Sequence, residues 1–279
     1  MTAMLPAERQ EMKARVRAHW EREVCGTRFA QGDDRRAYFA ELERYRYEQD
    51  YMLRDFAQFP SGRGKRVIEV GVGAGSDFLN WVRSGAEACG YDITQAAVDL
   101  VHERLGLEGL AADVSVGDAE ALPAPSGAFD IFYSWGVLHH TPDTEKAIAE
   151  AYRVLKPGCV LKIMLYHFPS VASLLVWTVH GPLARDFRSI RAVCADHIES
   201  PNTNLFTTAE ARAMVGRYFQ PSTVSIRTFL GSGDLLSNTA LSEQYGDKWK
   251  IAMRLYPRWF VRRLLGHSFG TVMTIEAVK

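Results

Sequence analysis

The sequence lacks the features that mark several classes of protein. Its four cysteines stand at positions 25, 89, 159 and 194 of 279 residues, without the paired spacing of a zinc site or a disulfide framework. The longest apolar run, residues 171–179, is too short to cross a bilayer, and residues 1–10 contain no apolar signal core. We therefore expect reduced thiols, no metal site, no membrane span and a cytoplasmic location.

The chain also lacks an excess of either charge, since 33 basic residues balance 33 acidic ones. Proteins that bind nucleic acid usually carry a basic surface, so the balance argues against such a partner. A composition of 47% hydrophobic and 24% charged residues is typical of one globular domain with insertions or with a cap. The sequence does not specify the oligomeric state, and a homodimer is one candidate.

From about residue 60 onward, strand-like and helix-like segments alternate. Apolar runs at residues 66–70, 88–92, 113–116, 129–134 and 159–165 are separated by helical patterns, and residues 223–229 and 272–278 resemble two final antiparallel strands. This alternation predicts an α/β fold with a Rossmann-like, seven-stranded, mostly parallel sheet and helices on both faces. We expect an N-terminal helical extension (1–60), a core (61–167), a lid insertion (168–206) and the end of the core with a further insertion (207–279).

A glycine cluster at residues 69–75, Glu-Val-Gly-Val-Gly-Ala-Gly, follows the first predicted strand and precedes a helix. Glycines let the backbone adopt positive φ and approach a ligand at a helix N-terminus. Glu69 would repel a pyrophosphate but attract a cationic ammonium or sulfonium, and Asp92 ends the next apolar run, where ribose hydroxyls are bound. Ser76 stands where a dinucleotide site has glycine or alanine. The pattern favours an adenosyl ligand with an amino-acid tail.

Four blocks in this order resemble the class I S-adenosylmethionine-dependent methyltransferases, the broad group that includes quinone-, sterol- and natural-product-modifying enzymes. The blocks are residues 69–75, 91–92, 117–123 and 129–143, followed by 152–158, and together they cover roughly residues 62–167. The resemblance implies S-adenosylmethionine as cofactor. The positions that it implies for cofactor binding are Glu69, Gly71, Gly73, Gly75, Asp92, Ile93, Asp118, Ala119, Glu120, Ser134 and Trp135.

Two adjacent histidines, His139 and His140, follow the fourth predicted strand, where the methyl acceptor is expected. Imidazole titrates near neutrality and suits a general base. Because adjacent residues point apart, we do not expect both to aim into one cleft. The resemblance implies that His139 is the base, with Tyr166 or His167 as its partner, although Tyr166 stands where some relatives carry an aspartate. The alternative is that the pair binds backbone carbonyls and stabilises the loop.

The predicted function is methyl transfer from S-adenosylmethionine to an oxygen or nitrogen of a small organic molecule, such as a natural-product intermediate or a sugar, by in-line displacement. Two alternatives remain open: C-methylation of a quinone- or isoprenoid-like acceptor, and a protein that binds the cofactor without transferring methyl. A nucleic-acid methyltransferase would carry a base-inserting motif after the fourth strand, and the sequence Ser-Trp-Gly-Val at residues 134–137 is not one.

Overall fold

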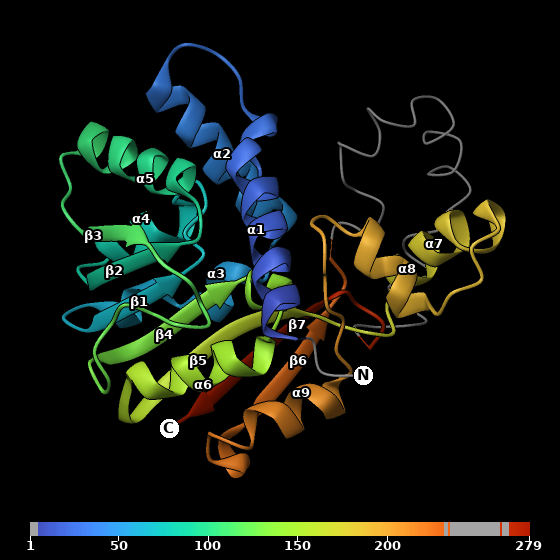
Figure 1. Ribbon diagram of the computed structural model, residues 1–279. Helices are drawn as coiled ribbons and strands as arrows, with labels where there is room; N and C mark the ends of the chain where they lie inside the picture. The colour runs from blue at the N-terminus through green and yellow to red at the C-terminus, as the bar shows by residue number, and fades with distance from the viewer. Residues whose placement is uncertain (1–4, 232–233, 235–262, 264–267) are drawn as a thin grey trace.

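The computed structural model describes residues 5–231, 234, 263 and 268–279. Its centre is a seven-stranded sheet in the order β3-β2-β1-β4-β5-β7-β6, in which β7 runs antiparallel to its two neighbours and the other pairs are parallel (Figure 1). The strands are β1 (Arg66–Val70), β2 (Glu87–Asp92), β3 (Asp113–Val116), β4 (Phe129–Trp135), β5 (Leu155–Tyr166), β6 (Ser225–Phe229) and β7 (Val272–Val278). The predicted Rossmann-like α/β fold is confirmed.

Helices cover both faces of the sheet because side chains alternate along each strand. Val67 of β1 packs with α4 (Ser76–Arg83) and α5 (Gln95–Glu108) in one core, whereas Ile68 packs with α6 (Thr144–Val154) and α9 (Thr208–Val215) in the other. Short helices complete the connections: α3 (Leu53–Ala57), η2 (Phe59–Gly62), η3 (Leu138–His140) and η5 (Pro221–Thr223). The continuous apolar run of β1 is therefore buried on both sides.

β5 begins earlier than the sequence predicts. Residues 156–158, Lys-Pro-Gly, look like a helix stop, and we expected the strand to start at residue 159. In the structure α6 ends at Val154 and β5 starts at Leu155, which pairs with Phe129 before the register shifts. A bulge tolerates proline in a strand, because it does not need the missing N–H.

Two N-terminal helices, α1 (Pro6–Arg22) and α2 (Arg35–Gln49), pack on the core, joined by η1 (Thr27–Phe29). Asp34 caps α2 by accepting hydrogen bonds from the backbone N–H groups of Arg36 and Ala37. The carboxylate of Glu21 in turn accepts from the backbone N–H groups of Gln95 and Ala96, at the start of α5. The extension is thus attached to the helix that follows Asp92.

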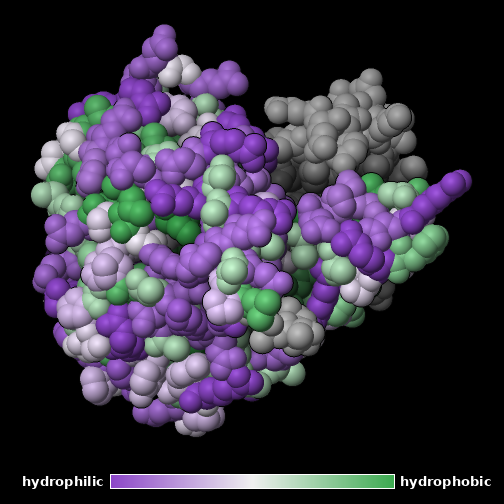
Figure 2. Space-filling view, viewed as in Figure 1, coloured by the Kyte–Doolittle hydropathy of each residue, from purple (hydrophilic) through white to green (hydrophobic). Residues whose placement is uncertain are grey.

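The insertion after β5 contains α7 (Val171–His180), η4 (Pro182–Ala184) and α8 (Ile190–His197), which stand to one side of the sheet in Figure 1. Leu183 and Phe187 are largely exposed there, while the face seen in Figure 2 is mostly hydrophilic. Within the described part of the chain, no helix is long and apolar enough to span a membrane. The expected second insertion, residues 231–270, lies largely outside the described residues.

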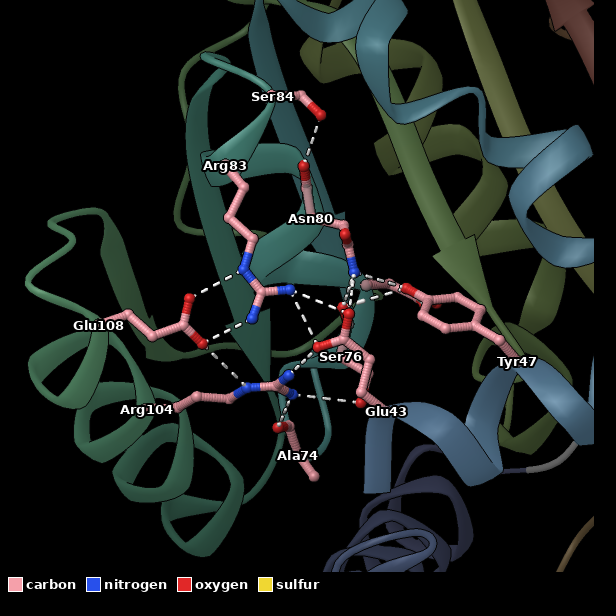
Figure 3. Close-up of polar contacts among 10 residues, drawn as sticks. Glu43, Tyr47, Ala74, Ser76, Asn80, Arg83, Ser84, Arg104 and Glu108 are labelled. Atoms are coloured by element: carbon pink, nitrogen blue, oxygen red, sulfur yellow. Dashed lines mark hydrogen bonds and ion pairs between the residues drawn. The ribbon is translucent and has the colours of Figure 1, made fainter. Parts of the chain in front are cut away.

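A buried ion-pair network joins α2 to α4 and α5 (Figure 3). Arg104, only 1% exposed, pairs with Glu43 and donates to the backbone carbonyl of Ala74 and the hydroxyl of Ser76 in the glycine turn. Arg83 bridges Glu43 and Glu108. Because the charged guanidinium of Arg104 is removed from water, it is stabilised by carboxylate partners, which are Glu43 and, at 3.8 Å, Glu108.

We expect Glu43→Gln to lower the free energy of unfolding by about 3 kcal/mol, because it removes the nearer of the two carboxylate partners of the buried Arg104 guanidinium and leaves only the longer contact with Glu108. The matched control is Glu48→Gln on the same helix, whose exposed pair with Arg44 contributes less than about 0.5 kcal/mol. Urea unfolding of both variants measures the difference. Equal losses of stability in the two variants would show that the network does not tie α2 to the core.

Candidate functional site

The glycine turn connects β1 to α4 in a backbone conformation that side chains disfavour. Gly71, Gly73 and Gly75 have φ values of 83°, 51° and 79°. The backbone N–H of Gly71 donates to the carbonyl of Tyr91 on β2 at 2.6 Å, so the turn is held close to the neighbouring strand. The turn therefore presents bare backbone at the carboxyl edge of the parallel strands, where ligands of such sheets bind.

Glu69, directly before the turn, is 3% exposed, and among the described residues its Oε2 atom has no hydrogen-bond partner. Burial, followed by the nearby Asp77 carboxylate, raises the pKa of Glu69 well above its ordinary value, while Arg46 acts in the opposite direction. A buried carboxylate oxygen without a donor is costly. The ammonium of an amino-acid ligand would supply that donor.

Asp92 ends β2 beside the turn. Its carboxylate accepts hydrogen bonds from the backbone N–H groups of Gly73 (3.1 Å) and Thr94 (3.0 Å) and from the Thr94 hydroxyl (2.8 Å). Burial raises its pKa, and these hydrogen bonds oppose the shift. The backbone N–H of Ile93 also interacts with this carboxylate and lowers its pKa. Ile93, a predicted cofactor-binding residue, follows in the same loop.

The third side of the site is the loop after β3. Asp118 accepts from the backbone N–H of Glu120, and Ala119 between them is 8% exposed. Lys13 of α1 pairs with Asp118 Oδ2 at 2.6 Å and with Glu120 Oε2 at 2.8 Å. The N-terminal extension thus reaches the predicted adenine-binding loop.

Ser134 and Trp135 at the end of β4 make contacts within the protein. The hydroxyl of Ser134 donates to the backbone carbonyl of Val70, and the indole N–H of Trp135 donates to Asp50 of the N-terminal extension. Burial raises the pKa of Asp50 to about 6, against the opposing effect of Arg46. Arg46 also binds Asp77 at 3.0 Å, which links α2 to the first turn of α4.

The two histidines lie on the short helix η3, with their ring centroids 4.2 Å apart. Both lie within reach of Glu199, since one potential ligand atom from each of the three residues lies within 4.8 Å of the others. The sequence predicts that the two rings do not both aim into one cleft, yet in the structure the rings are neighbours and a nitrogen atom of each lies close to Glu199.

His139 is 0% exposed and stacks on the ring of Tyr166 at 4.0 Å. Burial, followed by the neighbouring His140, lowers its pKa well below the ordinary value, so the ring is neutral. The other predicted partner, His167, is directed elsewhere: its Nδ1 atom lies 2.9 Å from the backbone carbonyl of Gly270. The structure therefore brings Tyr166, and not His167, to the histidine pair.

Glu199 is a member of the site that the sequence did not reveal. It lies in the loop after α8, and its Oε2 atom is 3.4 Å from His140 Nε2. Partial removal from water raises its pKa, but interactions with His140 and then with the Tyr166 hydroxyl more than offset this and leave the pKa below its ordinary value. With φ at 55°, Glu199 also adopts a left-handed conformation that is costly for a residue other than glycine.

Comparison with known proteins agrees with this geometry. A family model described as a methyltransferase domain matches residues 68–163. Phthiotriol/phenolphthiotriol dimycocerosates methyltransferase 1 of Mycobacterium ulcerans is 38% identical over 97 residues, which are 34% of this chain and 35% of that protein. Ajmaline N-methyltransferase of Rauvolfia serpentina is 34% identical over 115 residues, 39% of this chain and 40% of the relative. Residues 68–163 form a class I S-adenosylmethionine-dependent methyltransferase domain.

The matched segment spans about a third of the length of these relatives. Solved methyltransferase structures resemble more of the chain. Phosphoethanolamine N-methyltransferase 2 of Haemonchus contortus aligns with a TM-score of 0.56 at 19% identity, over 84% of this chain and 52% of that one. A putative sarcosine dimethylglycine methyltransferase of Galdieria sulphuraria also reaches 0.56 at 15% identity, over 96% and 98%. At these identities the likeness shows the methyltransferase fold alone.

The glycine turn of the methyltransferase domain offers a matched pair of substitutions. A Cβ atom on Gly71 would lie 2.1 Å from Val137 Cγ2, whereas a Cβ on Gly73 would meet no described atom within 4 Å. We expect Gly71→Ala to lower the free energy of unfolding by roughly 3 kcal/mol or more, from overpacking and positive φ together. Gly73→Ala should cost only about 1 kcal/mol.

Gly73→Ala should instead weaken binding of S-adenosylhomocysteine, because the added methyl group fills the open space beside the turn. Urea unfolding and isothermal titration calorimetry separate the two effects. If Gly71→Ala is as stable as Gly73→Ala, the contact with Val137 is not the constraint that we describe.

Proposed function

We propose that this protein transfers a methyl group from S-adenosylmethionine to an oxygen or nitrogen atom of a small organic molecule. The observation that carries the proposal is the buried Glu69 carboxylate, whose Oε2 lacks a donor within the described structure, behind a glycine turn with Asp92 on the next strand. A cationic amino-acid end and a ribose fit these two groups. The family of the domain supports the same ligand.

In this proposal Glu69 orients the amino group, directly or through water, and the N–H groups and bare faces of Gly71, Gly73 and Gly75 border the amino-acid end of the cofactor. Asp92 accepts from the ribose hydroxyls, with Ile93 beside it. At the adenine end Asp118, Ala119 and Glu120 form the binding loop, and Lys13 shares the Asp118 carboxylate or releases it on binding. Bound S-adenosylmethionine supplies an electrophilic methyl group on a sulfonium.

The remaining task of the chain is to hold the acceptor in line with the methyl group and to exclude water. Residues from outside the core are available for this. Trp20 of α1 contacts the ring of His140 with centroids 5.6 Å apart, and Glu199 reaches the same histidine from the insertion after β5. We propose that α1 and the loop after α8 together enclose the acceptor.

We propose that the proton released by the acceptor passes to the cluster around His139 and His140, with Tyr166 as a positioning residue. His139 is the predicted base, and His167 stays a prediction that no contact with the pair supports. The new member, Glu199, is 43% exposed and is the carboxylate of the cluster that an acceptor can reach. It lies in the loop after α8 and provides a carboxylate next to Tyr166, where some relatives carry an aspartate on β5.

The acceptor class is a small organic molecule such as a natural-product intermediate or a sugar. The named relatives act on a mycobacterial lipid and on an alkaloid, and a third relative, 34% identical over 113 residues, is a 2-methyl-6-phytyl-1,4-hydroquinone methyltransferase of Oryza sativa subsp. japonica. That relative supports the alternative of C-methylation on a quinone-like acceptor. Balanced charge favours these acceptors over nucleic acid.

Methyl transfer is tested with cofactor that carries a labelled methyl group and a panel of hydroxyl, amine and hydroquinone acceptors. We expect label to leave the protein and appear in at least one small organic product. The Asp92→Ala protein is the control. We expect it to transfer no labelled methyl group when the cofactor concentration is low. Cofactor binding by calorimetry with no labelled product across the panel would favour a protein that binds S-adenosylmethionine without transferring methyl.

Substitutions on the two sides of the site should separate binding from turnover. We expect His139→Ala to lower kcat by about 100-fold or more, as loss of a proton acceptor does, with little change in the Kd of the cofactor. Asp92→Ala should chiefly raise that Kd. His102→Ala, an exposed histidine on α5, serves as control and should change neither. An unchanged kcat in His139→Ala would remove the histidine from the mechanism.

A further inference from the structure

We propose that His139, His140 and Glu199 together bind one divalent transition-metal ion at the acceptor side of the site. The sequence predicts no metal site, because its cysteines are scattered and Glu199 stands 59 residues from His140. The structure brings the three side chains together, with one nitrogen or oxygen atom of each within 4.8 Å of the others. Two imidazoles and one carboxylate are ligands that zinc, iron, cobalt and nickel accept.

The first argument is the state of His139. It is completely enclosed, yet neither of its ring nitrogens has a hydrogen-bond partner within the described structure. A neutral imidazole carries one bare lone pair and one N–H group, and leaving both unsatisfied inside a protein costs free energy. A metal ion between the two histidines would take up the lone pair.

The second argument is the tautomer of His140. Its Nδ1 atom lies 2.8 Å from the Ser200 hydroxyl and 3.2 Å from the Thr203 hydroxyl. The Thr203 hydroxyl donates its own proton to the backbone carbonyls of Ile198 and Ser200, so it can only accept from His140. When the Ser200 hydroxyl donates to the backbone carbonyl of Pro201, 3.3 Å away, both hydroxyls accept from the Nδ1–H group of a neutral His140, and Nε2 is left with a bare lone pair. Metal-binding histidines are commonly held in this way by the other nitrogen.

The third argument is distance. His140 Nε2 is 3.4 Å from Glu199 Oε2, and it makes no hydrogen bond with any described residue. This separation suits a cation shared by the nitrogen and the carboxylate, either a proton, as in an ordinary ion pair, or a metal ion. Two ligand atoms bound at about 2.1 Å to a tetrahedral ion stand about 3.4 Å apart. A ligand atom of His139 lies within 4.8 Å of one ligand atom each of His140 and Glu199.

Three protein ligands leave a fourth position open, as catalytic zinc sites do. Here the open side is that of Glu199, because its side chain is 43% exposed while those of the two histidines are enclosed. An acceptor hydroxyl bound to the ion there would lose its proton more readily. The role in methyl transfer rests on the proposed function and favours an oxygen acceptor, whereas the binding of metal does not depend on that function.

Metal binding is tested on full-length protein without a histidine tag after dialysis against EDTA. We expect one equivalent of Co²⁺ to bind and to produce visible absorption bands, and one equivalent of Zn²⁺ to displace it. Glu199→Gln and His140→Ala should each weaken binding by at least about 10-fold, and Ser200→Ala by about 10-fold through loss of the tautomer. Glu199→Asp should retain part of the affinity.

The chain supplies a stringent control in a second histidine pair. His180 of α7 and His197 of α8 stack with centroids 4.1 Å apart, and His197 is exposed, so the pair is suited to adventitious binding. The double variant His180→Ala/His197→Ala should keep the full Co²⁺ spectrum. Because the Glu199 side chain is partly exposed, Glu199→Gln is the substitution that we expect to disturb folding least. Circular dichroism checks that this variant is folded.

The proposal is overturned if the wild-type protein binds neither Co²⁺ nor Zn²⁺. It is also overturned if the His180→Ala/His197→Ala variant loses metal binding while the variants at His140 and Glu199 keep it. If EDTA-treated protein transfers methyl at the full rate, the catalytic role is wrong. If methyl transfer is absent while Co²⁺ binds at the three residues, the proposed function fails and the metal site stands. Calorimetric binding of S-adenosylhomocysteine reports separately on the cofactor side in every variant.

Discussion

The close approach of the glycine turn to the loop after β4 is the constraint on which both halves of the site depend. Gly71 leaves room for the Val137 side chain, which would otherwise overlap a Cβ atom. Val137 immediately precedes η3, the short helix that carries both histidines. One contact between backbone and side chain therefore sets the distance between the glycine turn and the start of η3.

The N-terminal helices extend this arrangement through charge pairs that cross between elements. Glu43 holds α2 to α5 through Arg104, which also donates to the carbonyl of Ala74 in the glycine turn. Lys13 reaches the loop after β3, and Glu21 caps α5. Several of these charged groups are buried. A buried ion pair is stable only when the distance and orientation of its two groups are favourable, whereas an exposed pair tolerates variation in both. The extension is thus positioned by the same groups that border the cofactor site.

How much of the site could be predicted depends on where each residue lies along the chain. Glu69 and Asp92 lie at the carboxyl ends of β1 and β2, and Asp118 follows β3 of the same parallel sheet, so the topology alone brings them to one edge. Glu199 follows a helix of the insertion in a segment without a motif, and the Arg46–Asp50 pair has the i, i+4 spacing of an ordinary solvated helix face. Such residues reach the site only through tertiary packing, and no local pattern distinguishes them.

The sequence by itself determined the parallel sheet, the glycine turn and the acids at the strand ends, because hydrophobic periodicity and backbone geometry act over a few neighbouring residues. Only the tertiary structure decided that β5 starts at Leu155, that His139 and His140 lie together beside Glu199, and that His167 contacts Gly270 instead. It also brought Glu199 to the histidines across about sixty residues of chain. Such contacts depend on the relative placement of elements, which residue spacing does not specify.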